Sequence, residues 1–384
     1  MKVSATQVVD GITKRVPLSV TRRVIRRGVL GINYHVVSDH ELPHISHVLQ
    51  YKSVKTFEGD LAYLQRHHDV ISYGDALEVA PAAGDGFDRQ RRNGNSVLLT
   101  FDDGYRECFS VVRPVLARHG IPCLFFVIAD AVDNRFLVYP NKVSLCIDNV
   151  VTATDAVAAD HLRLMGEHFG LDFPTVGSFA RWMRSLQIAD TTAIDAAGSL
   201  LGIDWQHFLG ERRPFMTGDE IRQLVAEGFT VGAHSLRHPY LRTLGDRASV
   251  EEEIVESCRF VKELTGQDRV PFAFPFSADG LDRDFLSDVV QRHDFIGLLF
   301  NTRELERDRS FIVNRVAGDG GLVPYGQSHL SEVLGAAYRR YMVRQFQTFV
   351  ASTGLRSRRV SVGQGAPRGS GVQQRTTPAE AGAP

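Results

Sequence analysis

Two short segments of the chain carry residue types that could hold a metal ion and move protons. Asp102 and Asp103 follow one run of apolar residues, and His234 and His238 follow another. Carboxylates and imidazoles serve both as metal ligands and as general acids or bases. The two segments could therefore support metal-assisted hydrolysis, provided that the fold brings them together.

The carboxylate pair ends a predicted strand. Residues 97–101 are mainly β-branched and apolar and are followed by Asp102, Asp103 and Gly104, which predicts a buried strand with two acids at its exposed end. Because successive strand side chains point to opposite faces, the two carboxylates should diverge and could take different roles. The alternative is an ordinary turn, since Asp and Gly supply local hydrogen bonds and positive φ.

The histidine pair follows a predicted strand at residues 229–233. Residues four apart share one face of a helical turn, and an open metal site needs about three protein ligands plus water. Two imidazoles and one carboxylate suit zinc or another first-row divalent ion. The alternative is a pair of surface histidines, because His40 and His44 have the same spacing. Spacing alone therefore does not identify the site.

The order of predicted elements is that of a parallel α/β fold. Apolar periodicity predicts a helix over 106–119 between strands at 97–101 and 123–128, which is a βαβ unit. Thr217 to Glu220 has the capping-box pattern of a helix start, and Ser249 to Glu252 repeats it. Further strands are predicted at residues 28–37, 270–274, 295–300 and 311–316, with a closing helix over 330–350.

Residues 131–214 interrupt this rhythm with mostly helical patterning and contain both tryptophans, Trp182 and Trp205. An insertion at the carboxyl end of a barrel strand would lie over the site, so this segment is a candidate substrate lid. The alternative, which we favour for at least one of the tryptophans, is that they pack the insertion's own core.

Both ends of the chain differ in composition from the middle. Residues 1–27 contain seven basic side chains and one acidic side chain, and residues 14–27 could form a short basic helix that contacts an anionic membrane surface. A solvated lead-in to the domain is the favoured alternative. Residues 351–384 lack apolar periodicity and are predicted to be disordered.

Composition limits the partners and the compartment. A net charge of −1 argues against nucleic acid as a partner. No apolar run approaches the ~20 residues that span a bilayer, which together with the cysteine pattern predicts a cytoplasmic location. The cysteines are scattered and three lie in strongly apolar sequence, so we expect reduced core residues; they are Cys108, Cys123, Cys146 and Cys258.

The two chemical segments resemble the first two signature motifs of the polysaccharide deacetylases, the NodB-homology or family 4 carbohydrate esterases. The matching segments are TFDDGY at 100–105 and HSLRHP at 234–239. The resemblance implies a distorted (β/α)7 TIM-like barrel over 28–350, with 131–214 inserted. It also implies a carbohydrate substrate, removal of N-acetyl groups from amino sugars, and a divalent metal ion, most readily Zn²⁺, with Co²⁺ or Ni²⁺ as alternatives.

The same resemblance implies roles for single residues. Asp103, His234 and His238 match the metal ligands of the family. Asp102 matches its general base, and the backbone N–H of Tyr105 matches a donor to the developing oxyanion. In the third motif, the resemblance implies that Pro275 and Phe276 contact the substrate.

Two departures from the family pattern are visible. The third motif, residues 272–276, lacks the usual arginine that orients the base, and no late Leu-x-His motif supplies a general acid. Both changes resemble the branch that deacetylates β-1,6-linked poly-N-acetylglucosamine, in which an amino-terminal Tyr-His segment carries the acid. Tyr34 and His35 match that segment, so His35 is the predicted acid, with His293 and His329 as weaker alternatives.

Arg315 is a candidate substitute for the missing arginine, because it lies at the end of a predicted strand. A structural salt bridge elsewhere is the alternative that we favour for it. Rival functions keep the same metal site but hydrolyse a formamido sugar, a cyclic amide or a lipid-linked glycan. A non-catalytic, glycan-binding barrel is a further rival.

Overall fold

The structure is a computed structural model that describes residues 28–79, 96–319 and 329–352. The predicted basic segment 1–27, with its membrane contact through 14–27, lies outside the described residues. The same is true of the predicted disordered tail, except residues 351 and 352, which are helical. The chain divides into one unit that ends at Val343 and a second that begins at Arg344.

Seven parallel strands close into a barrel. Their order around it is β1-β8-β7-β6-β5-β4-β3, and β1 pairs with β3 to complete the circle. The short strand β2 (Asp69–Val70) pairs with β3 outside the circle. The predicted distorted (β/α)7 barrel is therefore confirmed. Its strands are β1 (Val29–Tyr34), β3 (Ser96–Phe101), β4 (Leu124–Val127), β5 (Thr230–Ala233), β6 (Val270–Ala273), β7 (Ile296–Asn301) and β8 (Ile312–Ala317).

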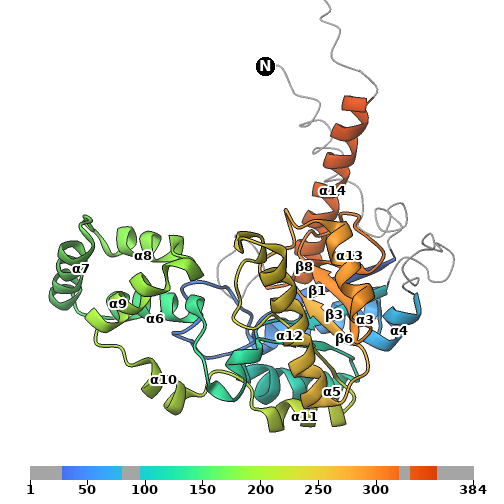
Figure 1. Ribbon diagram of the computed structural model, residues 1–384, viewed down its shortest axis with the longest axis horizontal. Coiled ribbons are helices and arrows are strands. Elements are labelled where there is room, and N and C mark those ends of the chain that lie inside the picture. The colour runs from blue at the N-terminus through green and yellow to red at the C-terminus, as the bar shows by residue number, and fades with distance from the viewer. Residues whose placement is uncertain (1–27, 80–95, 320–328, 353–384) are drawn as a thin grey trace, which may run out of the picture. The chain divides into compact units, whose positions relative to one another are not determined.

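Helices surround the strands (Figure 1). The capping box between Thr217 and Glu220 begins α11 as predicted. The predicted start of α12 at Ser249 is wrong, because the Asp246 side chain accepts from the Ser249 N–H and starts the helix at Arg247. The helices are α3 (Val54–His67), α4 (Tyr73–Val79), α5 (Arg113–His119), α11 (Gly218–Ala226), α12 (Arg247–Thr265), α13 (Arg283–Arg292) and α14 (Leu330–Ser352), with a π-helix (Cys108–Val112) and a 3-10 helix (Leu241–Thr243).

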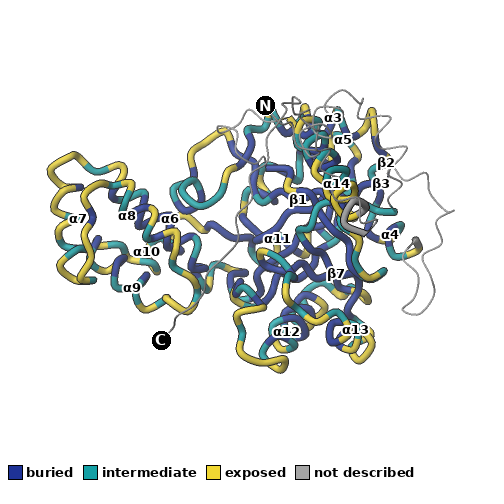
Figure 2. The backbone as a smooth tube through the Cα atoms, turned by 90° about the horizontal axis from the view of Figure 1, so that it is seen from above, coloured by how far each residue is buried: buried dark blue, intermediate teal, exposed yellow. Residues whose placement is uncertain are grey.

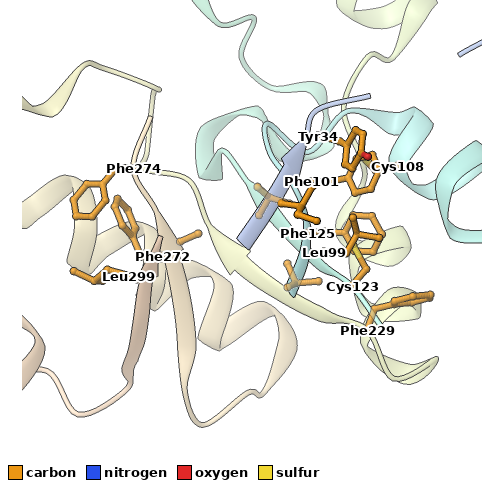
Figure 3. Packing of buried hydrophobic residues seen from close by; sticks show 14 of the residues in the cluster. Tyr34, Leu99, Phe101, Cys108, Cys123, Phe125, Phe229, Phe272, Phe274 and Leu299 are labelled. Carbon is orange, nitrogen blue, oxygen red and sulfur yellow. The ribbon is translucent and has the colours of Figure 1, made fainter. Parts of the chain in front are cut away.

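Alternate side chains of each strand face either the barrel interior or the helices. Leu99 and Phe101 of β3 pack in the layer beneath the helices, whereas Leu98 lies in the interior cluster. Phe101 stacks between Tyr34 and Phe125 (Figure 3). The ring centroids are 5.4 and 5.8 Å apart. This packing holds β3 and thereby fixes the position of its carboxyl end.

The insertion after β4 forms a helical cluster with its own core (Figure 1). Trp182 packs against Phe169 and Phe173 at centroid distances of 4.7 and 5.2 Å, and Trp205 lies so close to Gly198 that a Cβ there would meet its ring at 2.0 Å. The favoured alternative for the tryptophans is confirmed. The helices are α6 (Tyr139–Val151), α7 (Asp155–Phe169), α8 (Val176–Ser185), α9 (Thr191–Leu200) and α10 (Trp205–Arg212), with 3-10 helices at Ala129–Asn134 and Ile188–Asp190.

The barrel and the helical insertion differ in how far their residues are buried (Figure 2). The barrel strands are buried along most of their length, and α7 is mostly exposed. All four cysteines are buried and unpaired, as predicted. Among the helices that the structure describes, none combines the length and the apolar character needed to cross a membrane.

Candidate metal centre

The ends of β3 and β5 place three polar side chains together. Asp103 Oδ1 lies 3.3 Å from His234 Nε2 and 3.2 Å from His238 Nε2. All three residues are buried, and one potential ligand atom of each lies within 4.8 Å of those of the other two. The two segments that the sequence singled out therefore converge at one edge of the barrel.

The hydrogen bonds and pKa values of these side chains fit a divalent cation. His234 Nδ1 donates to the Ala273 carbonyl at 2.8 Å, which leaves the lone pair of Nε2 toward Asp103. Burial raises the pKa of Asp103, but the adjacent imidazoles of His238 and His234 hold it well below its usual range. Burial lowers the pKa of His238. A metal ion binds a deprotonated carboxylate and a deprotonated imidazole nitrogen, and the lowered pKa values of Asp103 and His238 favour these states.

The backbone at this edge of the barrel is strained. A non-glycine residue with positive φ is uncommon and often marks a functional site. Four such residues lie here, at φ values of 70°, 65°, 62° and 60°: Asp103, Ser235, His238 and Phe276. Gly104 also has a positive φ, and a Cβ on it would meet Val127 at 3.1 Å. The Asp-Asp-Gly segment is thus a turn, and it also carries two of the candidate site residues.

The Asp102 carboxylate diverges from Asp103 and enters the barrel. Arg315 Nη1 and Nη2 donate to its two oxygens at 2.6 and 2.9 Å, and Nη1 also donates to Thr100 Oγ1 at 3.1 Å. Arg315 is fully buried. The expectation that Arg315 forms a salt bridge elsewhere is therefore wrong, and β8 supplies the arginine that the third motif lacks.

The interior of the barrel is shaped to admit the Arg315 side chain. Its guanidinium lies 5.4 Å from the ring of Phe126 and 6.0 Å from that of Phe300. Opposite the aliphatic stem, β1 has Gly31, where a Cβ would stand 2.3 Å from Arg315 Cγ. Only glycine leaves room for the arginine at this position.

His35 lies just beyond the end of β1 and forms an ion pair with Asp319. Its Nδ1 lies 2.6 Å from Asp319 Oδ2. Burial by itself lowers the pKa of His35, but the hydrogen bond and charge of Asp319, with smaller contributions from Asp103 and Asp102, raise it to about 9. Burial raises the pKa of Asp319 against the opposing effect of His35. His35 is consequently protonated at neutral pH.

The backbone around Tyr105 is held on both sides. Arg106 N–H donates to the Pro214 carbonyl at 2.8 Å, and Met216 N–H donates to the Gly104 carbonyl at 3.0 Å. The Tyr105 ring stacks on Phe215 at 5.6 Å. The Tyr105 amide therefore has a fixed orientation beside Asp103.

Pro275 and Phe276 differ in exposure although they are adjacent. Pro275 is buried, whereas Phe276 is 44% exposed and its ring lies 4.9 Å from that of His238. Phe276 is thus an exposed aromatic residue in direct contact with one of the clustered histidines.

Neither of the two alternative acids belongs to the site, whereas one acidic residue of the site was not predicted. His293 pairs with Glu251 at 3.1 Å and precedes β7, so it lies at the opposite end of a strand from the site. His329 is exposed beside the start of α14. Asp319 was not predicted, because a lone acid after a strand gives no signal; only the partner imidazole identifies it.

The chain was compared with known proteins. Residues 89–168 and 181–293 match the family described as polysaccharide deacetylase. No curated protein sequence matches the chain. Among solved structures, IcaB from Ammonifex degensii is 18% identical with a TM-score of 0.47, and the match covers 81% of this chain and 97% of that one.

Two further structures are similar at the same level. Streptococcus pyogenes deacetylase PplD in complex with acetate is 11% identical with a TM-score of 0.45, covering 75% of this chain and 92% of its own. The de-N-acetylase from Aggregatibacter actinomycetemcomitans is 14% identical with a TM-score of 0.44, covering 75% and 93%. The family match spans half of the chain and includes both segments of the candidate site. The chain accordingly belongs to the polysaccharide deacetylase family, whose members are hydrolases of amide bonds.

Proposed function

We propose that this protein is a divalent-metal-dependent hydrolase that removes N-acetyl groups from an N-acetylated amino sugar or polysaccharide. The observation that carries the proposal is the buried cluster of Asp103, His234 and His238 beside an Asp102 carboxylate fixed by Arg315. Metal ligands and a preset base next to one another are the requirements of amide hydrolysis by activated water.

Asp103, His234 and His238 would hold the metal ion, and their nitrogen and oxygen donors suit Zn²⁺ first, with Co²⁺ or Ni²⁺ as alternatives. When bound, a divalent cation supplies Lewis acidity toward the acetyl carbonyl and lowers the pKa of water toward ~7. Asp103 Oδ1 is buried without a hydrogen-bond partner among the described residues, as expected of an atom reserved for a metal.

Asp102 acts as the general base. Burial raises its pKa, but Arg315 opposes this and the net pKa lies below the usual range, so the carboxylate is ionised at neutral pH. Arg315 engages both oxygens in a bidentate pair that fixes the plane of the carboxylate. Arg315 is thus a positioning residue, and Asp102 receives the proton of the attacking water.

His35 acts as the general acid. A group that protonates the departing amine must carry its proton at the working pH, and Asp319 keeps the pKa of His35 at about 9. Asp319 also fixes the imidazole through Nδ1, which leaves Nε2 for the substrate. The Tyr105 amide donates to the developing oxyanion, and of the two residues of the third motif only the exposed Phe276 contacts the substrate, beside His238.

The proposal is tested by measuring product release from a panel of N-acetylated and N-formylated amino sugars, a cyclic amide and β-1,6- and β-1,4-linked oligomers. We expect acetate from N-acetylated sugars and loss of at least ~100-fold in kcat for His35→Ala. Formate release alone, or cyclic amide hydrolysis alone, would replace the proposed substrate. Oligomer binding without any product would identify a glycan-binding barrel instead.

A further inference from the structure

Two of the proposed metal ligands lie on a segment that belongs to no helix or strand. His234 directly follows β5, and His238 ends the segment. Both Ser235 and His238 have a positive φ, at 65° and 62°. Such conformations are unfavourable in residues other than glycine and persist only where surrounding contacts impose them. We call residues 234–238 the histidine loop, and its shape needs a cause outside the loop.

The neighbouring strand holds the histidine loop through the carbonyl groups of the loop. The Ala129 N–H donates to the Ser235 carbonyl and the Asp130 N–H donates to the Leu236 carbonyl, each at 3.1 Å. Both donors come shortly after β4, which pairs with β5. Within the loop, the His238 N–H donates to Ser235 Oγ at 2.9 Å. The N–H groups in the middle of the loop need a different acceptor.

The Glu253 side chain of α12 supplies this acceptor. The Leu236 N–H donates to Glu253 Oε2 at 2.7 Å. Burial raises the pKa of Glu253, and hydrogen bonds from the N–H groups of Leu236 and Arg237 oppose that rise. Hydrogen bonds to a carboxylate are stronger than those between neutral groups. Leu236 is therefore held at both of its backbone groups, by Glu253 on one side and by Asp130 on the other.

The helix α12 gives Glu253 a fixed position. One side of this helix is buried in the barrel core, and Ser257 Oγ donates to the Glu253 carbonyl at 2.6 Å. A side chain on a packed helix is held more precisely than one on a loop. The buried apolar residues of α12 are Val250, Ile254, Val255, Cys258 and Val261.

An ion pair also touches the histidine loop, but it is exposed. Arg237 Nε donates to Asp130 Oδ2 at 2.7 Å, and the Arg237 side chain is 64% exposed. Exposed ion pairs contribute little to stability. The contact between Glu253 and Leu236 differs, because it is partly buried and involves the backbone of the loop itself. Glu253 is thus the side chain outside the loop that can fix its backbone.

Holding ligands in place before the ion arrives increases metal affinity, and groups that orient ligands contribute to it although they do not touch the metal. We infer that Glu253 is a positioning residue of the candidate metal centre, which acts through Leu236 to hold His234 and His238 where they can bind the ion. This inference rests on the proposed function and adds a residue outside both motif segments. Glu253 is not one of the three clustered potential ligands.

The first test measures amide hydrogen exchange in the metal-free protein. In Glu253→Ala the Leu236 amide loses its acceptor and should exchange at least ~10-fold faster. Glu253→Gln keeps a neutral carbonyl acceptor, so its Leu236 exchange rate should lie between those of the wild type and Glu253→Ala. Glu252→Ala, at the exposed neighbouring position of α12, is the matched control and should exchange like the wild type.

The second test measures the zinc Kd by competition with a chromophoric chelator, which needs no turnover. The Kd should rise ~10- to ~100-fold in Glu253→Ala, the loss typical of a residue that orients metal ligands. It should rise less in Glu253→Gln and stay unchanged in Glu252→Ala. A role in stability alone would lower the melting temperature of the metal-free variant and leave the zinc Kd of the folded protein unchanged.

An unchanged zinc Kd or an unchanged Leu236 exchange rate in folded Glu253→Ala would overturn the inference. If Glu253→Ala does not fold, Glu253→Gln decides: a Kd raised at least ~3-fold supports the inference, and a wild-type Kd overturns it. Absence of zinc binding in the wild type would refute the metal-dependent function proposed above. The exchange rates of the metal-free proteins would still decide whether Glu253 holds the loop.

Discussion

Asp102 is buried next to the guanidinium of Arg315, and the ionisation of its carboxylate depends on that positive charge. Its carboxylate is 3% exposed and accepts both hydrogen bonds of the Arg315 fork. Removing one partner of a buried ion pair leaves an uncompensated charge, which typically costs ~3–5 kcal/mol. At the scale of single residues, a change in the Asp102–Arg315 pair should therefore alter both the stability of the fold and the pKa of the Asp102 carboxylate.

Replacing Arg315 by Met should weaken the base in a pH-dependent way. Without the guanidinium, burial dominates and the pKa of Asp102 rises, so the carboxylate is protonated at a higher pH. The acidic limb of kcat/KM against pH should move to higher pH, and the melting temperature should fall. Arg315→Lys retains the charge and should move the limb less. A limb that stays in place in Arg315→Met would show that Arg315 does not act on Asp102.

Replacing Asp319 by Asn should shift the alkaline limb of the pH profile of kcat, through the pKa of His35. Asp319 is the main group that raises the pKa of His35, so its removal leaves burial, which lowers that pKa. The acid then loses its proton below pH 9 and the alkaline limb of kcat moves to lower pH. Glu251→Gln, which removes the partner of the remote His293, is the control and should leave the limb in place.

The residues of the candidate site differ in how readily they can be predicted from the local sequence pattern. Asp102 and Asp103 are adjacent to a strand, and His234 and His238 are close to each other, so local pattern is enough. Arg315 lies more than 200 positions from its partner. Strand alternation gives one signal for it, because Val313 of the same strand lies in the barrel interior and Arg315 has the same parity.

At the scale of elements, the strand ends of the barrel position the groups and one glycine admits the arginine. The predicted order of strands and helices was sufficient to place the ends of β3 and β5 at one edge, because parallel strands share their direction. The sequence could not show that Gly31 faces Arg315. A glycine within a strand indicates only that something approaches closely.

Gly31→Ala should reproduce the effect of losing Arg315. The new methyl would meet the Arg315 stem at 2.3 Å and displace the guanidinium from Asp102. We expect kcat to fall by ~10-fold or more, with a lower melting temperature. Gly59→Ala is the matched control, since Gly59 is exposed on α3 and a Cβ there would have no neighbour within 4 Å. Wild-type kcat in Gly31→Ala would contradict the positioning role of Arg315.

At the scale of the molecule, the barrel and the insertion have separate cores joined by a third cluster. The barrel core and the insertion core share no buried residue among those that the structure describes. A third cluster, which includes Val36, Tyr105, Leu145 and Phe215, connects them. The sequence predicted an insertion from its broken periodicity, but contacts between residues so far apart in the chain depend on the folded barrel and are invisible to local pattern.

The proposed metal ligands come from segments about 130 positions apart, so bound metal should stabilise the folded chain. Chelation should lower the melting temperature by several degrees, because a ligand at 100 times its Kd contributes ~2.7 kcal/mol. Differential scanning calorimetry with and without chelator measures the shift. In Asp103→Asn the shift should largely disappear. Identical melting curves for wild-type protein with and without metal would argue against the cluster as a metal centre.

The most direct test of the account is acetate release from an N-acetylglucosamine oligomer by metal-stripped protein before and after zinc, cobalt or nickel is returned. We predict no release from the stripped protein and recovery at about one metal per chain. Asp102→Asn should bind the same amount of metal and release no acetate. Undiminished release from the stripped protein, or turnover by Asp102→Asn, would contradict the account.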